Sequence, residues 1–189
     1  MNVTSIYVPA SINIIGESAF EGISGLTTIV FENESTIEFI GKNAFKGTAF
    51  IDSAINKDGF LVINGMLVKS NLTGNVVIDH RVKMILDGAF VSSDIISVTI
   101  NDGCEFIREG AFAFGESLEW ILIPESVRTL GRYIFARCTA LREVTLPDGI
   151  VYVGIGAFSD CYSLSHVHMP NAIRVVSDYT FSCCSNLES

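Results

Sequence analysis

The sequence predicts a solenoid of stacked repeats rather than a domain with one central core. Strand-like segments and turn signals alternate along the chain, and a phenylalanine recurs with them, at a spacing of 23 residues over the last four copies. A fixed period between about 20 and 50 residues is typical of solenoids, in which each unit packs only on its neighbours. The seven phenylalanines are Phe20, Phe45, Phe90, Phe112, Phe135, Phe158 and Phe181.

The first element of each repeat is a short strand. In the segment 141–147 the apolar side chains of Leu141, Val144 and Leu146 should face inward, while Glu143 and Thr145 should point to the opposite face, because strand side chains alternate. The proline that follows three of these strands has no amide donor and should end the ladder. Such strands are expected at 3–8, 26–31, 76–78, 95–100, 118–123, 141–146 and 164–169.

The second element is an extended segment that leads into a turn at an Ala-Phe pair. We expect this pair to form one short helical turn with the aromatic ring directed inward. Four residues before the ring, several repeats carry a glycine, which suits unusual dihedrals or close packing. Because Leu86, Arg108 and Ser177 replace it elsewhere, the backbone there should not be strictly left-handed. The glycines are Gly16, Gly41, Gly131 and Gly154.

One interval in the phenylalanine series is about twice the period, from Phe45 to Phe90. It contains two β-rich runs, 60–63 and 66–69, joined by Asn64-Gly65. Asn-Gly between strands favours a two-residue type I′ turn, which needs positive φ at both residues. We therefore expect an insert at 48–75 whose β-hairpin projects from, or folds against, a single solenoid spanning 1–189.

Composition and charge exclude several classes of function. The net charge is −9, from 21 acidic and 12 basic residues, and no basic block is present that could bind nucleic acid or an anionic membrane surface. The sequence contains no run of 18 apolar residues, so membrane insertion is not expected. Residues 1–20 show no signal peptide, which leaves a cytosolic chain or a fragment whose leader lies elsewhere.

No sequence motif predicts catalysis, a metal site or a cofactor. The chain has no Gly-x-Ser-x-Gly elbow, no phosphate-binding glycine loop and no His-Glu-x-x-His helix. The fragment Gly154-Ile155-Gly156 lies inside a repeat and is interpreted as turn and packing glycines. We therefore predict a protein that is not an enzyme.

The cysteines follow the repeat as well. Cys138, Cys161 and Cys184 share the 23-residue period and should occupy one stacked position on adjacent coils. A column of small buried thiols is favoured, because free cysteine is among the most buried residue types. A disulfide between coils is the alternative, and the total of five leaves at least one cysteine unpaired within the chain.

The repeat L-x-x-I-x-I-P-x-x-V-x-x-I-G-x-x-A-F-x-x-C resembles the BspA-like leucine-rich repeats. The resemblance is carried by 118–138, 141–161 and 164–184, and the hairpin sequence at 59–67 is similar to an insert of this family. It implies an α/β, right-handed leucine-rich repeat solenoid with a parallel sheet on its concave face. It also implies a surface-displayed or secreted adhesion module whose partner is a protein, often a host matrix protein.

The outward strand positions are the candidate binding site, because the concave strands of a solenoid are its usual recognition surface. Trp120, the only tryptophan, points outward and is a candidate hot spot. The alternative is that a neighbouring loop covers its ring. The predicted ligand-binding residues are Tyr7, Thr99, Trp120, Leu122, Glu143, Thr145, His166 and His168.

His166 and His168 lie two apart on one strand and should point to the same side, beside Glu143. This group could hold zinc, but a pair of histidines without a clear third ligand is more often solvent-facing, since catalytic zinc needs three protein ligands. No metal site is predicted.

A second interpretation of the whole chain is a structural spacer that displays the hairpin or an absent domain. The sequence stops at Leu187-Glu188-Ser189, where a further strand would start, and no polar cap is visible. Solenoids need capped termini for solubility. We therefore expect either a fragment of a longer array or end-to-end self-association through uncapped terminal repeats.

Overall fold

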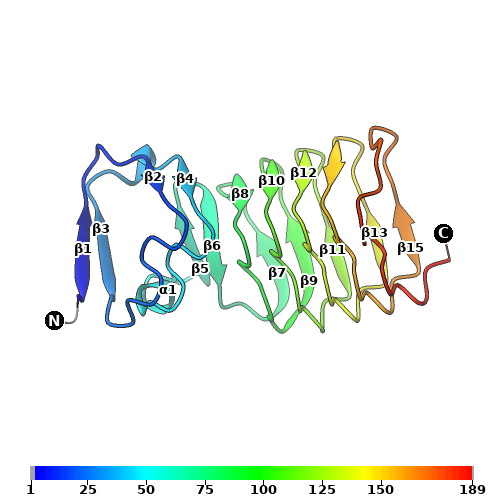
Figure 1. The fold of residues 1–189 in the computed structure, drawn as a ribbon, viewed down its shortest axis with the longest axis horizontal. Coiled ribbons are helices and arrows are strands. Elements are labelled where there is room, and N and C mark those ends of the chain that lie inside the picture. The colour runs from blue at the N-terminus through cyan, green and yellow to red at the C-terminus, as the bar shows by residue number, and fades with distance from the viewer. Residues whose placement is uncertain (1–2, 189) are drawn as a thin grey trace.

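A computed structural model describes residues 3–188 and shows an elongated stack of coils with the two ends of the chain at opposite ends of the stack (Figure 1). The coils place their strands in two rows, and the strands of neighbouring coils pair in parallel within each row. This confirms the predicted solenoid with parallel sheets.

The strands of the first row bury alternate side chains, as the apolar pattern predicts. They form a two-stranded sheet, β1-β3, and a five-stranded sheet, β15-β13-β11-β9-β7. Their bounds are β1 Ser5–Val8, β3 Thr28–Phe31, β7 Gly74–Ile78, β9 Ile95–Ile100, β11 Trp120–Leu122, β13 Glu143–Thr145 and β15 His166–His168.

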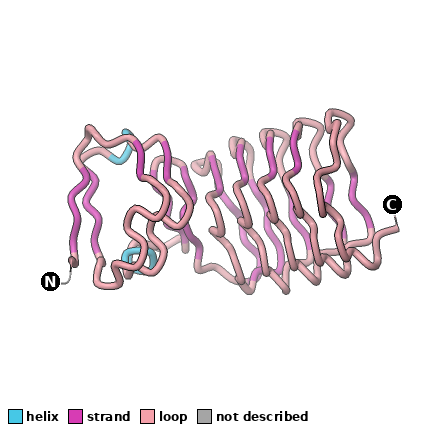
Figure 2. Tube along the Cα trace, in the orientation of Figure 1, coloured by secondary structure: helices cyan, strands magenta, loops and turns pink. Residues whose placement is uncertain are grey.

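The strands of the second row are two residues long except in the hairpin. They form the pair β2-β4 and a six-stranded sheet, β14-β12-β10-β8-β6-β5. Their bounds are β2 Ile14–Ile15, β4 Phe39–Ile40, β5 Phe60–Ile63, β6 Met66–Ser70, β8 Met84–Ile85, β10 Phe106–Ile107, β12 Thr129–Leu130 and β14 Tyr152–Val153. Loops and turns make up most of the remaining chain (Figure 2).

The predicted helical turn at the Ala-Phe pair is wrong. The backbone is left-handed two residues before and two residues after each phenylalanine, as at Tyr133 (φ 52°) and Arg137 (φ 63°) around Phe135. A right-handed helix cannot pass through such residues. Within residues 3–188 the helices are α1, Phe50–Ser53, and a 3₁₀ turn, Glu34–Thr36, so the helical content is small.

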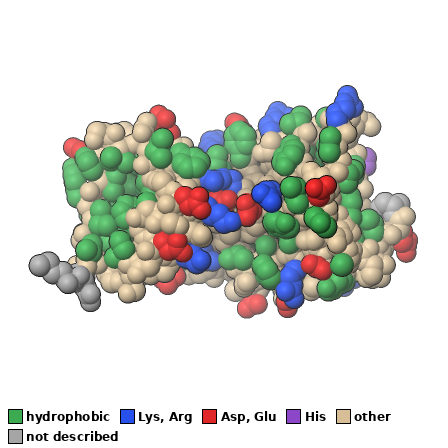
Figure 3. Space-filling model, in the orientation of Figure 1, with side chains coloured by type: hydrophobic (Ala, Val, Ile, Leu, Met, Phe, Trp, Pro, Cys, Tyr) green, Lys and Arg blue, Asp and Glu red, His purple; other side chains and the backbone are tan. Residues whose placement is uncertain are grey.

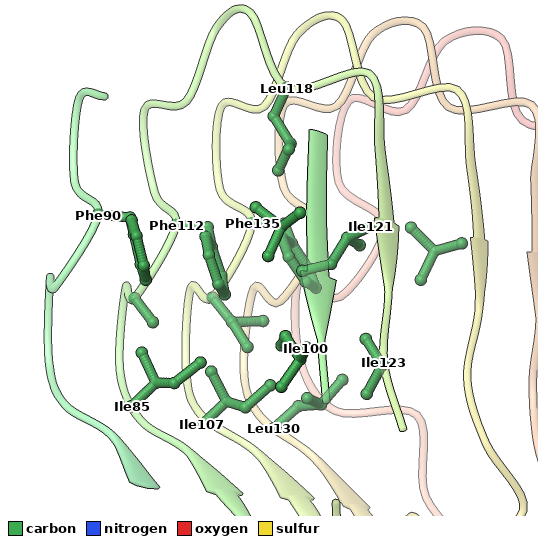
Figure 4. Close-up of a cluster of buried hydrophobic side chains, with 14 of the residues drawn as sticks. Ile85, Phe90, Ile100, Ile107, Phe112, Leu118, Ile121, Ile123, Leu130 and Phe135 are labelled. Carbon is green, nitrogen blue, oxygen red and sulfur yellow. The ribbon is translucent and has the colours of Figure 1, made fainter. Parts of the chain in front are cut away.

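The phenylalanine rings stack along the axis of the solenoid (Figure 4). Phe90, Phe112, Phe135 and Phe158 are buried, and successive ring centroids lie 5.0, 5.7 and 5.4 Å apart. The backbone beside the rings is bonded from coil to coil: the Phe135 amide donates to the Ala157 carbonyl at 2.8 Å. The ring column is therefore the inner spine of the coils.

The hairpin lies within the stack and does not project from it. β5 and β6 are antiparallel, Asn64 and Gly65 both have positive φ, and β6 pairs in parallel with β8. Both faces of the hairpin are buried. Phe60 and Leu67 pack in the core of the later coils, whereas Ile63 and Met66 pack in the core of the first coils. The hairpin therefore separates two cores.

The recurring glycine position serves close packing. A Cβ atom on Gly131 would lie 2.4 Å from the Arg108 carbonyl carbon, and one on Gly154 would lie 2.5 Å from the Arg132 nitrogen. Neither glycine has positive φ, in agreement with the sequence analysis. At Gly41, Gly131 and Gly154 this position therefore lets two backbones approach. Leu86, which replaces the glycine after the hairpin, instead packs in the core of the first coils.

The repeated cysteines form the predicted column of free thiols. Cys138, Cys161 and Cys184 each donate a thiol hydrogen bond to a phenylalanine carbonyl of the preceding coil, at 3.2, 3.1 and 3.0 Å. All five cysteines are free, which argues against the disulfide alternative. Burial raises the pKa of Cys138 to about 12 and also raises the pKa of Cys161. Thiols in this environment are poor nucleophiles.

Replacing a spine residue should destabilise the chain strongly. We expect Phe135→Ala to lower the free energy of unfolding by about 3–5 kcal/mol, because it leaves a cavity between two stacked rings. Phe106→Ala is the control, since Phe106 is 38% exposed; it should cost about 1 kcal/mol. Equal losses for the two variants in urea unfolding would contradict the assigned register.

The glycine position allows a matched comparison between two coils. Gly131→Ala should destabilise the chain by about 1–3 kcal/mol, because the added methyl group overlaps backbone atoms. Gly16 occupies the same place in the repeat but a Cβ there meets nothing within 4 Å. Gly16→Ala should therefore change stability by less than about 0.5 kcal/mol. Thermal unfolding of both variants tests the close-packing role, which fails if they behave alike.

Thiol reactivity should follow burial. Iodoacetamide at pH 8 should modify Cys183 of the folded chain first, because Cys183 is exposed whereas Cys104, Cys138 and Cys161 are buried. All five cysteines should react once the chain is unfolded. Peptide mapping by mass spectrometry measures both patterns, and rapid labelling of Cys138 in the folded chain would refute the column.

Candidate functional site

The outer face of the five-stranded sheet brings most of the predicted residues together. Residues paired in a parallel ladder point to the same side of the sheet. Trp120 pairs with Ser97 and Glu143, and Glu143 pairs with His166. Beside this column, Leu122 pairs with Thr99, and Thr145 pairs with His168. The two predicted columns therefore exist on β9, β11, β13 and β15.

Large apolar side chains are accessible at the centre of this surface. Trp120 is 48% exposed and Leu122 is 57% exposed, whereas Ile121 between them is buried. The described residues therefore leave about half of the Trp120 side chain open, contrary to the alternative in which a loop covers it. Glu143, Thr145, His166 and His168 are also exposed, and Thr99 is partly buried. An aromatic and an aliphatic side chain thus lie beside polar ones.

Tyr7 does not join this surface. It lies on β1, which pairs with β3 in a separate two-stranded sheet beyond the hairpin region (Figure 1). Tyr7 is 59% exposed. Partial desolvation and the nearby Glu32 raise the pKa of its hydroxyl group, which keeps the hydroxyl protonated. The insert therefore divides the row of outward residues that the sequence analysis treats as continuous.

The histidine pair shows no ligand set for a metal ion. His166 and His168 are exposed, and the His166 ring nitrogen Nδ1 lies 2.9 Å from the Ser165 hydroxyl. Within residues 3–188, no group of three histidine, cysteine, aspartate or glutamate side chains is arranged to hold a metal. The two rings are therefore polar groups of the sheet surface.

The structure adds residues that the sequence analysis missed. Val77 pairs with Thr99 and is 59% exposed, so it continues the Leu122 column onto β7. Asn75 accepts a hydrogen bond from the buried Ser97 hydroxyl at 2.7 Å. Ser97 pairs with Trp120, so Asn75 extends the Trp120 column onto β7. Strand alternation in Val76-Val77-Ile78 could have predicted that Val77 points outward, but no proline follows this strand to mark its register.

A second candidate region is a groove of about 770 Å³ on another part of the molecule. It is lined by residues of the coil at 40–47, of the hairpin and of the coils that follow it. Charged side chains gather near the middle of one face, with hydrophobic side chains on either side (Figure 3). The groove has no sequence motif, because its residues come from coils that the insert separates.

The helices described in residues 3–188 are too short to cross a membrane. Several solved bacterial proteins of low sequence identity share this fold. A leucine rich cell surface protein from Faecalibacterium prausnitzii aligns with a TM-score of 0.67 and 20% identity, over 97% of this chain and 58% of that one. The pneumococcal vaccine antigen PcpA aligns with a TM-score of 0.61 and 21% identity, over 90% and 52% of the two chains.

A leucine-rich repeat protein from Eubacterium ventriosum aligns over 100% of this chain and 72% of its own length, with a TM-score of 0.57 and 18% identity. The chain therefore spans just over half the length of the first two proteins. No curated protein matches the sequence. The model of the BspA type leucine rich repeat region matches residues 1–119 and 105–189, with six copies of the repeat. The chain belongs to the BspA type leucine rich repeat family.

Proposed function

We propose that this chain is a non-enzymatic binding module that recognises a protein ligand through the outer face of the five-stranded sheet. The observation that carries the proposal is the exposed pair Trp120 and Leu122 at the centre of that face, extended by Val77. Aromatic residues surrounded by polar ones are typical of the energetic centres of protein interfaces.

The dimensions of the surface suit a protein ligand. Five strands at a spacing of about 4.8 Å present a face about 19 Å wide, which is a flat platform rather than a pocket for a small molecule. The polar residues Glu143, Thr145 and His168 border the apolar centre and can form hydrogen bonds with a ligand. A rigid frame of this kind loses little conformational entropy when it binds, which favours affinity.

We further propose that the module is displayed at a cell surface or secreted and that its ligand is a matrix protein of a host. Support comes from family membership and from the description of the Faecalibacterium protein as a cell surface protein. Family membership and this description support the proposed location, whereas the identity of the ligand has to be tested by binding.

The burial of the hairpin argues against a spacer whose role is to display the hairpin. Phe60, Leu61, Ile63, Met66 and Leu67 of the hairpin are buried. The exposed tip residue Asn64 is held against the solenoid, since its amide side chain donates to the Ile37 carbonyl at 2.8 Å. Little of the hairpin is free to be presented to a partner, and its removal should expose two cores.

Binding of the chain to a panel of immobilised extracellular matrix proteins, measured by biolayer interferometry, tests the proposal. For any protein that binds, Trp120→Ala should weaken the affinity by at least about tenfold, as expected for a hot spot. Tyr152→Ala is a matched control, because Tyr152 is also 48% exposed but lies on β14 of the second row. The proposal would be wrong if Trp120→Ala bound with undiminished affinity, or if both variants lost affinity equally.

A further inference from the structure

The groove beside the hairpin exists because the insert interrupts the stack. The coil at 40–47 and the coil at 86–91 line the same groove, although an ordinary pair of neighbouring coils would close onto each other. Two contacts run from the coil at 40–47 to the coil at 106–112, which follows the coil at 86–91: the Lys42 ammonium lies 2.7 Å from Glu109, and the Arg108 guanidinium donates to the Ile40 carbonyl at 2.8 Å. Specific interactions between the coil at 40–47 and the coil at 106–112 therefore border the groove.

Much of the groove wall is apolar. Phe45 and Leu86 are buried side chains that line it, and Val68 of β6 and Ile51 of α1 are partly buried. Val91 and Phe114, also in the lining, are 38% and 44% exposed. A concave apolar surface with a few polar groups, and a volume within about 300–1,000 Å³, is typical of sites for small molecules.

Most of the charged groups in and beside the groove already have partners. Glu109 pairs with Lys42, Asp87 pairs with Arg108 at 3.0 Å, and Lys46 pairs with Glu21 at 3.5 Å. Arg137 lies over the Phe114 ring, 5.3 Å from its centroid. Asp160 lies 3.3 Å from the Tyr162 hydroxyl, which donates to it.

Lys69 is the exception. It lines the groove and is partly buried, yet among residues 3–188 it forms neither a hydrogen bond nor an ion pair with another side chain. The Asp52 carboxylate is near enough to favour its charge, but burial has the larger effect and lowers the pKa of Lys69. A desolvated ammonium without a partner is an unfavourable arrangement, which an anion would relieve.

We propose that this groove binds a small molecule that combines a compact apolar body with one carboxylate, and that Lys69 pairs with the carboxylate. The apolar body would lie against Phe45, Val68 and Leu86. Lys69 is the partly buried cation of the lining without a partner, since Lys42 pairs with Glu109 and the exposed Arg137 lies over the Phe114 ring, and one carboxylate would match its single charge. The site is separate from the outer face of β11 and β13, so it does not depend on the proposed function.

The probe pair 4-phenylbutanoate and 4-phenylbutan-1-ol tests the proposal, because the two molecules share an apolar body and differ in charge. Isothermal titration calorimetry on the whole chain should show one site for the acid and at least about tenfold weaker binding for the alcohol, as expected for a charge-assisted hydrogen bond. Equal affinity for both probes, or no heat from the acid up to millimolar concentration, would overturn it.

Three variants assign the effect to Lys69. Lys69→Met keeps the aliphatic stem and should bind acid and alcohol alike, whereas Lys69→Arg keeps the charge and should still prefer the acid. Lys57→Met is the control, since Lys57 is exposed and lies outside the groove lining; it should match the parent chain. Thermal unfolding must show that each variant is folded. An unchanged preference for the acid in folded Lys69→Met would refute the proposal.

Discussion

Contact between phenylalanine rings of successive coils is the interaction on which the rest of this solenoid depends. The ring centroids of Phe90, Phe112 and Phe135 lie 5.0 and 5.7 Å apart, close to the spacing of about 4.8 Å between hydrogen-bonded strands. One translation therefore satisfies the strand ladders and the rings together. The left-handed residues on each side of a ring, such as Tyr133 and Arg137, reverse the chain tightly enough to keep the ring inside. Stacking, pairing and turn geometry are thus parts of a single constraint.

The insert shows what happens when that constraint is interrupted. The ring column stops at Phe45 and resumes at Phe90, and the insert supplies an aromatic end to each half: Phe50 contacts Phe45 at 5.3 Å, and Phe60 contacts Phe90 at 6.5 Å with its ring nearly perpendicular. The hairpin is buried on both faces because it has a core on each side. Its presence also accompanies the groove, across which the Arg108 side chain of a later coil donates a hydrogen bond to the Ile40 carbonyl.

Period and alternation allowed much of this structure to be predicted from the sequence. The inward ring of Phe135 and the outward position of Trp120 follow from spacing, because a repeat fixes each residue relative to its counterparts. The turn conformation did not follow from the sequence, because Tyr133 is not a residue type that marks positive φ. Glycine at the equivalent positions Gly110 and Gly156 was the available indication of positive φ. The isolation of Tyr7 from the main sheet and the groove at Lys69 depend on contacts between distant segments, which a local pattern does not contain.

The two faces of a first-row strand have different freedom to vary. Ile121 and Val144 point inward and are both buried β-branched residues, a kind of side chain that packs well on a pleated surface. The outward residues beside them, Trp120 and Glu143, differ in size and charge although they pair directly in the ladder. A repeat can therefore change its outer residue without disturbing the spine. We infer that such a solenoid recognises a ligand through different side chains placed at equal intervals along its outer face. In this chain the exposed apolar pair on β11, Trp120 and Leu122, lies at the centre of the five-stranded sheet.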